Sequence, residues 1–140
     1  MTVVAANQAG APAEREARGR ATLEKVNGVA ASVQSGWLAD IAPDLDGFIT
    51  EFAFGDVLSR PGLALKTREL ATVAALTALG NARPQLVAHI EGALNVGNSP
   101  REVVEVILQM TVYAGFPAAI NGLDAAKEVF QRRGLKVEAS

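Results

Sequence analysis

The chain has 140 residues, of which 49% are hydrophobic and only 20% charged, with 13 basic against 15 acidic side chains. This length suits one domain, and so many apolar residues in so small a chain suggest surface that is covered by other subunits. A net charge of -2 without a basic run excludes nucleic acid as a partner, and no apolar run approaches the roughly 18 residues of a membrane span.

The N-terminal segment does not resemble a secretory signal, because residues 1–14 contain no Lys or Arg and only one short apolar run, Val3–Ala6. We therefore expect a cytoplasmic protein with a flexible N-terminal arm over residues 1–12. A single helical domain is predicted over residues 13–134, and residues 135–140 form a C-terminal tail.

Two helices are predicted in the first part of this domain. The first is broken or bent, runs from about residue 13 to 38 and closes on Trp37. The second follows Pro43, which suits a first helical turn, and ends at Arg60-Pro61-Gly62. Three-four spacing places four apolar side chains on one face of this second helix: Leu45, Phe48, Ile49 and Phe52.

A third helix is predicted from about residue 66 to 79, ending at Gly80. Its apolar residues leave little polar surface, so it should be the central and most buried helix. Pro84 opens a fourth helix, which Gly97 ends.

The clearest local signal begins the fifth helix. Ser99-Pro100-Arg101-Glu102 predicts a capping box, in which the Ser99 hydroxyl and the Glu102 carboxylate satisfy backbone donors reciprocally. We expect the inward face of this helix to include Met110 and Tyr113. A sixth helix over residues 117–133 should bury Ile120 and stop at Gly134. No strand pattern competes, so the fold class is all-α with about six helices.

The sequence resembles the carboxymuconolactone decarboxylase family in segments that together span about residues 48–130. The resemblance implies a compact helical bundle of the alkylhydroperoxidase D-like type that forms a homo-oligomer, a trimer or a hexamer, with active sites near subunit contacts. The segments that carry it are Phe52–Leu63, Lys66–Leu70, Ala78–Gly80, His89–Gly97 and Val112–Ala119.

The family has a redox branch, and this chain lacks its chemistry. Peroxidase members carry a Cys-x-x-Cys pair twelve residues after a glutamate, whereas here Asn81 and Pro84 stand at those two places after Glu69. The chain contains no cysteine, so thiol peroxidase chemistry is excluded. With a single histidine, a multi-histidine metal site within one chain is excluded too, and we predict no metal and no cofactor.

The non-redox branch includes an enzyme that decarboxylates 4-carboxymuconolactone in aromatic catabolism. Loss of carbon dioxide from such a substrate requires stabilisation of an enolate-like oxygen and an acid that reprotonates carbon. A histidine suits the proton transfer, and arginines suit a carboxylate anchor. We therefore predict a cofactor-independent lyase acting on a small carboxylated lactone.

His89 lies on the apolar stripe of the fourth helix, where a hydrogen-bonded core histidine is the plainer interpretation; its match to the family's characteristic histidine favours a catalytic role. Asp56 is either a pocket base or orienter of His89, or a structural partner of Arg60 one turn on. Glu69 either contacts a buried partner or favours the helix dipole at the start of its helix, and the dipole is the interpretation that we prefer.

Arg60 and Arg68 flank the Pro-Gly turn and are candidates for the carboxylate anchor, although turn arginines are usually solvated. Tyr113 is either a ligand contact at a helix end or a packed core residue. Asn121 is a candidate donor to a substrate carbonyl or an idle surface side chain. Phe54, with Trp37 and Phe52, either lines an apolar pocket or fills the core.

Two other functions remain open on the sequence. One is a related enzyme that does not decarboxylate and acts on a polyketide-like or other biosynthetic intermediate. The other is a catalytically silent oligomeric module that binds a small molecule.

Overall fold

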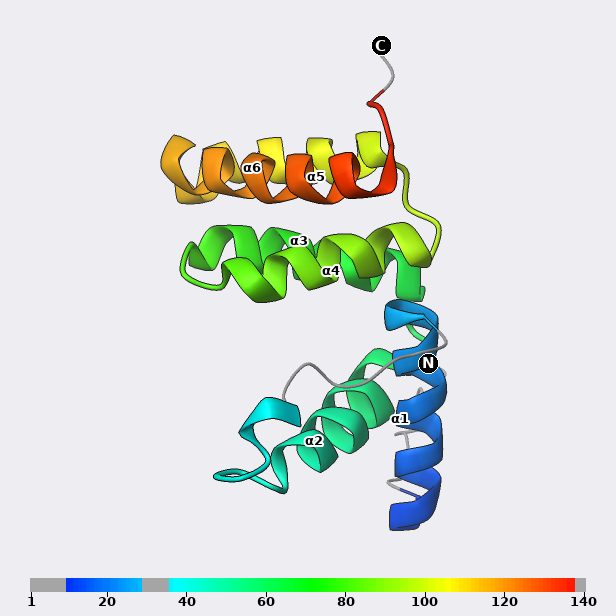
Figure 1. Ribbon diagram of the computed structural model, residues 1–140. Coiled ribbons are helices and arrows are strands. Elements are labelled where there is room, and N and C mark those ends of the chain that lie inside the picture. The colour runs from blue at the N-terminus through cyan, green and yellow to red at the C-terminus, as the bar shows by residue number, and fades with distance from the viewer. Residues whose placement is uncertain (1–9, 29–35, 138–140) are drawn as a thin grey trace. The chain divides into compact units, whose positions relative to one another are not determined.

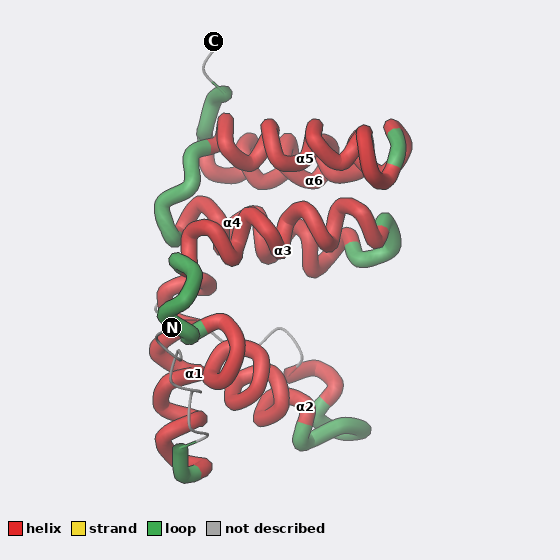
Figure 2. The backbone as a smooth tube through the Cα atoms, turned by 180° about the vertical axis from the view of Figure 1, so that it is seen from behind, coloured by secondary structure: helices red, strands yellow, loops and turns green. Residues whose placement is uncertain are grey.

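The computed structural model describes residues 10–28 and 36–137, and the chain divides into two compact units between Leu63 and Ala64. Residues 1–9 of the predicted arm, 29–35 of the predicted first helix and 138–140 of the predicted tail lie outside the described residues. The part that is described is helical and contains no strand, which confirms the all-α prediction with six helices (Figure 1, Figure 2). None of its helices has the length and apolar character needed to cross a membrane.

The first unit is built on two long helical segments. Helix α1 spans Pro12–Asn27 and packs against η2, a π-helix over Phe48–Leu58 that continues the short α2, Leu45–Gly47. A single 3-10 turn, η1, covers Gly36–Leu38. The predicted second helix therefore exists, although most of it has π geometry.

Two glycines allow α1 and η2 to touch backbone to backbone. A Cβ added at Gly19 of α1 would overlap the carbonyl oxygen of Thr50, and one added at Gly55 of η2 would lie 2.6 Å from the carbonyl oxygen of Arg15. Any larger residue would force the helices apart. Around this contact the unit buries Leu23, Val26 and Phe54.

The predicted apolar face of the second helix is wrong at Phe48 and Phe52, which are 67% and 61% exposed. A π-helix closes its hydrogen bonds over five residues, so three-four spacing no longer marks one face. Thr50, Phe54 and Gly55 are the buried residues of η2 instead. Trp37 is also exposed, so neither it nor Phe52 fills the core of the chain, whereas Phe54 does.

The second unit is a four-helix bundle. Its helices are α3, Leu65–Leu79, α4, Arg83–Asn95, α5, Pro100–Ala114, and α6, Phe116–Arg133. The hairpin of α3 and α4 stacks on the hairpin of α5 and α6, so that α3 faces α5 and α4 faces α6 (Figure 1, Figure 2). The bundle's apolar core consists of Val73, Leu86, Ile90, Ala93, Val103, Ile107, Ala125, Ala126, Val129 and Phe130.

Helix α3 contacts the other three helices of the bundle, as each of its four helices does, so its contacts do not single it out as central. It is not the most buried one, because its last residue, Leu79, is 64% exposed and α6 buries more of its residues. The predicted helix ends are confirmed: Gly80 and Gly134 end α3 and α6 with φ of 73° and 64°, which only glycine adopts readily. The Ser99–Glu102 capping box is present at the start of α5.

Two residues predicted to face inward do not. Tyr113 is 76% exposed and Ile120 is 61% exposed. The buried residues of α5 are Val103, Ile107 and Met110, so its inward stripe ends before the last turn. On α6 small residues face the bundle, beginning with Ala119, and this register turns Ile120 outward.

Candidate active site

His89 and Glu69 form the one hydrogen-bonded pair in the described residues that joins a histidine to a carboxylate. The Nδ1 atom of His89 on α4 lies 2.9 Å from Oε2 of Glu69 on α3. The Glu69 side chain is fully buried, whereas 25% of the His89 side chain is exposed. The imidazole ring therefore lies at the edge of the bundle core, and its Nδ1 atom is bound to the buried Glu69 side chain.

The pairing defines the state of the imidazole. With Glu69 ionised, its carboxylate can only accept hydrogen bonds, which assigns the proton of the neutral ring to Nδ1 and leaves Nε2 for a ligand. Such a carboxylate fixes the orientation of the ring and stabilises the imidazolium when it forms. The pair can thus hold or move a proton at Nε2.

Glu69 is also under-satisfied. Its second oxygen, Oε1, is buried and has no hydrogen-bond partner among the described residues. A buried carboxylate with a free oxygen is costly, since desolvation is only partly offset by the bond to His89. Glu69 therefore does not act mainly on the helix dipole, the interpretation that the sequence favoured; it is buried with a partner.

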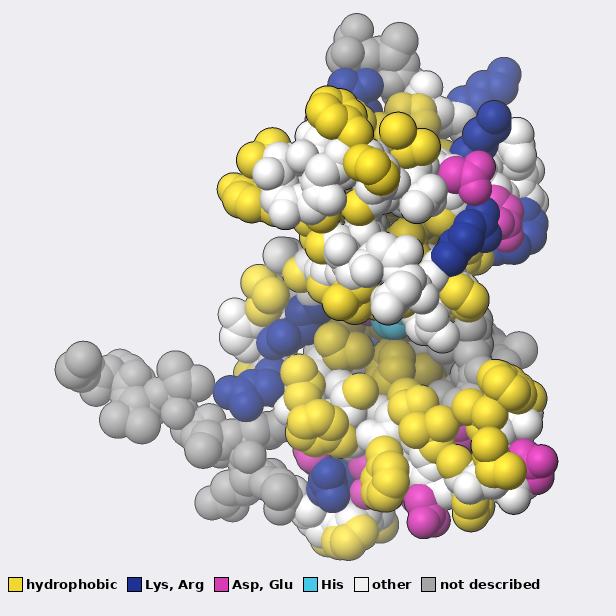
Figure 3. Space-filling model, turned by 90° about the vertical axis from the view of Figure 1, so that its left-hand side faces the viewer, with side chains coloured by type: hydrophobic (Ala, Val, Ile, Leu, Met, Phe, Trp, Pro, Cys, Tyr) yellow, Lys and Arg dark blue, Asp and Glu magenta, His cyan; other side chains and the backbone are white. Residues whose placement is uncertain are grey.

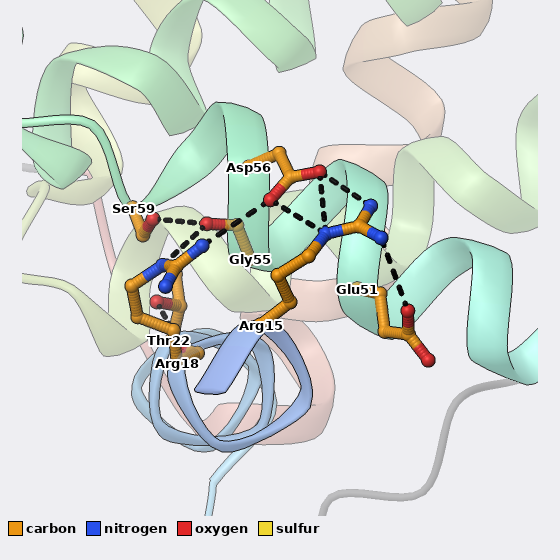
Figure 4. Close-up of polar contacts among 7 residues, drawn as sticks. All are labelled: Arg15, Arg18, Thr22, Glu51, Gly55, Asp56 and Ser59. Atoms are coloured by element: carbon orange, nitrogen blue, oxygen red, sulfur yellow. Dashed lines mark hydrogen bonds and ion pairs between the residues drawn. The ribbon is translucent and has the colours of Figure 1, made fainter. Parts of the chain in front are cut away.

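Asp56 lies in the first unit and is held by two arginines from α1, as Figure 4 shows. Nε of Arg15 donates to both Asp56 oxygens, at 3.1 and 3.0 Å, and Nη2 of Arg18 donates to Oδ1 at 3.3 Å. Arg15 also reaches Glu51 at 3.4 Å, and Nε of Arg18 donates to the Gly55 carbonyl at 3.0 Å. The hydrogen bond from Arg15 is the main reason that the pKa of Asp56 is lowered below its ordinary value.

This cluster changes the interpretation of Asp56. The sequence offered Arg60 as its structural partner, whereas the structure gives it Arg15 and Arg18. Its proposed contact with His89 stays a prediction, because Asp56 and His89 belong to different units. Nδ1 of His89 already has Glu69 as its partner.

The remaining predicted site residues are divided between the two units. Arg60 is exposed in the first unit and Arg68 is half-buried in the second. Asn121 is exposed on α6, and the exposed Tyr113 is not the packed core residue of the plainer interpretation. Phe54 is buried within the first unit. No group of three or more potential metal ligands occurs among the residues that the structure describes.

Arg15 and Arg18 are the residues that sequence reasoning missed. They lie 41 and 38 residues before their partner Asp56, beyond any local spacing rule. The one feature of the sequence that could have pointed to them is their three-residue spacing, which places both on one face of α1 next to Gly19. For Glu69 and His89 the signal was stronger, since each is a lone ionisable residue on an apolar stripe.

Comparison with known proteins gives a consistent picture. Residues 43–128 match the model of the carboxymuconolactone decarboxylase family. The chain is 42% identical over 101 residues to 4-carboxymuconolactone decarboxylase of Acinetobacter baylyi, a match that covers 72% of this chain and 75% of that protein.

Two further relatives are more distant. An uncharacterized 15.0 kDa protein of Paracoccus denitrificans is 37% identical over 91 residues, covering 64% of this chain and 68% of that protein. A nitrosuccinic acid decarboxylase of Metarhizium robertsii is 39% identical over 75 residues, which are 54% of this chain and 52% of that protein.

Proposed function

The chain belongs to the carboxymuconolactone decarboxylase family, and on that premise we propose that it is a cofactor-independent decarboxylase of small carboxylated lactones. A decarboxylase-like carbon–carbon lyase agrees with two of its relatives, which are named as decarboxylases. The observation that carries the mechanism is the bond of 2.9 Å between Nδ1 of His89 and the buried carboxylate of Glu69.

The reaction needs one proton and one electron acceptor. The bond between the carboxylate carbon and its neighbour breaks, carbon dioxide leaves, and the electron pair moves into the conjugated lactone to give an enolate. His89 acts here as the imidazolium, with a proton on each ring nitrogen: it delivers the Nε2 proton to the enolate carbon, is left neutral with its remaining proton on Nδ1, and regains a proton at Nε2 from solvent. No electron is exchanged with a cofactor in these reaction steps.

We assign the orienting role to Glu69. Its bond occupies Nδ1 and leaves Nε2 for the substrate, on a side chain that is 25% exposed. A fixed tautomer matters because a ring that rotates or exchanges tautomers presents the wrong atom to the substrate. Asp56, predicted for this role, is proposed instead to secure α1 on η2 through Arg15 and Arg18.

The anchor for the substrate carboxylate remains with Arg60 or Arg68, which offer the bidentate geometry that carboxylates prefer. Tyr113 and Asn121, both exposed within the chain, stay candidate substrate contacts. We also propose a cytoplasmic homo-oligomer, a trimer or a hexamer. Its support is the exposed apolar surface of the single chain, including Tyr113 and Phe116 near the turn of α5 into α6.

The proposed activity is tested by measuring carbon dioxide release from purified protein. The substrate panel contains carboxylated lactones, including 4-carboxymuconolactone, together with nitrosuccinic acid. When carbon dioxide leaves either kind of compound, the electron pair that stays behind is accepted within the substrate, by the conjugated lactone or by the nitro group. Neither reaction therefore needs a cofactor. Enzyme-dependent release from a lactone supports the proposal.

Carbon dioxide release from nitrosuccinic acid alone would support decarboxylase activity but would show that lactones are not the substrate class. Consumption of a lactone without carbon dioxide would favour the non-decarboxylating alternative. Binding without turnover of any compound would favour the silent module.

A further inference from the structure

Asn98 is a buried polar residue in the turn between α4 and α5, with only 4% of its surface exposed. Its side-chain Nδ2 donates to the carbonyl oxygen of Lys66 at 2.9 Å and to that of Ala93 at 3.0 Å. Both hydrogens of the amide are therefore used, one on α3 and one on α4.

These two carbonyls lie close along the chain to the proposed catalytic pair. Lys66 precedes Glu69 by three residues on α3, and Ala93 follows His89 by four residues on α4. Each distance is about one helical turn. The Asn98 amide thus fixes the backbones of the two helices relative to each other one turn from the hydrogen bond between Glu69 and His89.

The oxygen of the Asn98 side chain makes no hydrogen bond within the described part of the chain, so the favourable contacts of this amide are the two that its nitrogen donates. Oδ1 of Asn98 is buried and has no hydrogen-bond partner among the described residues. An unsatisfied buried acceptor lowers stability, so filling this space with an apolar side chain would remove that cost. Only the two donated bonds distinguish asparagine from an apolar residue of similar size here.

The local backbone holds Asn98 in place. Its own N–H donates to the Ala93 carbonyl at 2.9 Å, and the next residue, Ser99, begins α5 through the capping box with Glu102. The amide therefore projects from a segment that is fixed on both sides. It does not depend on a mobile surface side chain.

We propose that Asn98 is a positioning residue that sets the register of α3 against α4 and so keeps the Glu69 carboxylate on Nδ1 of His89. The proposal rests on the proposed function of His89, because positioning matters only if the ring transfers protons. A misplacement of about 1 Å at a catalytic group is enough to cost on the order of a hundredfold in rate.

The tautomer of His89 provides a test that requires no substrate. His89 is the only histidine in the chain, so the imidazole nitrogens of labelled protein give unambiguous 15N signals. With the ring neutral, we expect the wild-type signal of a proton fixed on Nδ1. In Asn98→Leu, which keeps side-chain size but donates nothing, we expect a mixture of the two tautomers in protein that still melts cooperatively.

Lys66→Gln is the matched control. It removes the exposed ion pair between Nζ of Lys66 and Glu102, at 3.0 Å, and leaves the Lys66 carbonyl bonded to Asn98. We expect the wild-type tautomer in this variant. On an identified substrate, Asn98→Leu should lower kcat by about tenfold to a hundredfold with a smaller effect on KM, and Lys66→Gln should change neither.

An unchanged His89 tautomer in folded Asn98→Leu overturns the proposal. If that variant does not fold, Asn98→Ser, which keeps one donor, should give an intermediate tautomer mixture. Failure of both to fold would make Asn98 a stability residue and also overturn the proposal. Retained turnover in His89→Gln would instead overturn the proposed function, whatever the tautomer measurements show.

Discussion

At the scale of single residues, Asp56 is a candidate catalytic carboxylate that the structure places in a cluster of ion pairs. Two α1 arginines donate to it, and the bond from Arg15 is the main cause of its lowered pKa (Figure 4). An aspartate whose pKa is lower when folded than when unfolded stabilises the protein above its unfolded pKa of about 3.9, and this stabilisation is lost as pH falls through the folded value.

We therefore expect Asp56→Asn to lower stability at neutral pH and to flatten the loss of stability between about pH 4 and more acid conditions. Denaturant midpoints measured over a pH series test this, with Asp40→Asn as the control at an exposed aspartate of the same unit. Parallel curves for wild type and Asp56→Asn would show that the arginine contacts contribute nothing to folding.

His89 and Glu69 were both candidates from the sequence, for different reasons. The apolar stripe alone favoured a core histidine, and the family resemblance pointed to a catalytic one, which stays a prediction. The preferred role of Glu69 was wrong, since spacing alone cannot show which buried group it meets. Arg15 and Arg18 escaped notice because α1 and η2 are distant in sequence. Their partners follow only from the packing of one helix on the other.

At the scale of elements, the close contact of α1 with η2 is the feature that the sequence did not predict. Helix-ending glycines and the capping box located α3, α5 and α6 to within one residue at the ends that they mark. The π geometry of η2 was missed because the three-four spacing of an α-helix was assumed. It rotates Phe48 and Phe52 outward and brings Gly55 against α1.

Gly19→Ala should therefore destabilise the protein by about 1–3 kcal/mol, because the new Cβ would overlap the Thr50 carbonyl oxygen, which is backbone and cannot simply turn away. Gly47→Ala is the control, since its Cβ would lie 3.9 Å from the Glu51 side chain, in ordinary contact. This variant should be neutral or slightly stabilising. Equal denaturation midpoints for both variants would argue against the backbone contact.

At the scale of the whole molecule, the single chain exposes a large amount of apolar surface. In the second unit, four exposed side chains surround the turn of α5 into α6, and we call them the turn cluster: Val112, Tyr113, Phe116 and Ile120. Figure 3 shows hydrophobic side chains gathered on the face that includes this turn. Surface of this kind usually marks a contact with another subunit.

Light scattering at micromolar concentration should accordingly give a mass of at least two chains. We expect Ile120→Asp, which places a charge in the turn cluster, to lower that mass. Gln131→Asp adds the same charge to an exposed site on the same helix and should leave the mass unchanged. A monomeric wild-type protein would remove the oligomer from the proposal.

The measurement that tests the account most directly compares turnover and melting of wild type and His89→Gln. Glutamine can hydrogen-bond to Glu69 but cannot shuttle a proton, so we expect a loss of about a hundredfold to ten-thousandfold in kcat on the substrate found in the carbon dioxide assay. The melting temperature should change little, because a structural loss here is limited to about 1–3 kcal/mol. A variant that keeps its turnover and melts far below wild type would contradict the account and make His89 a core residue.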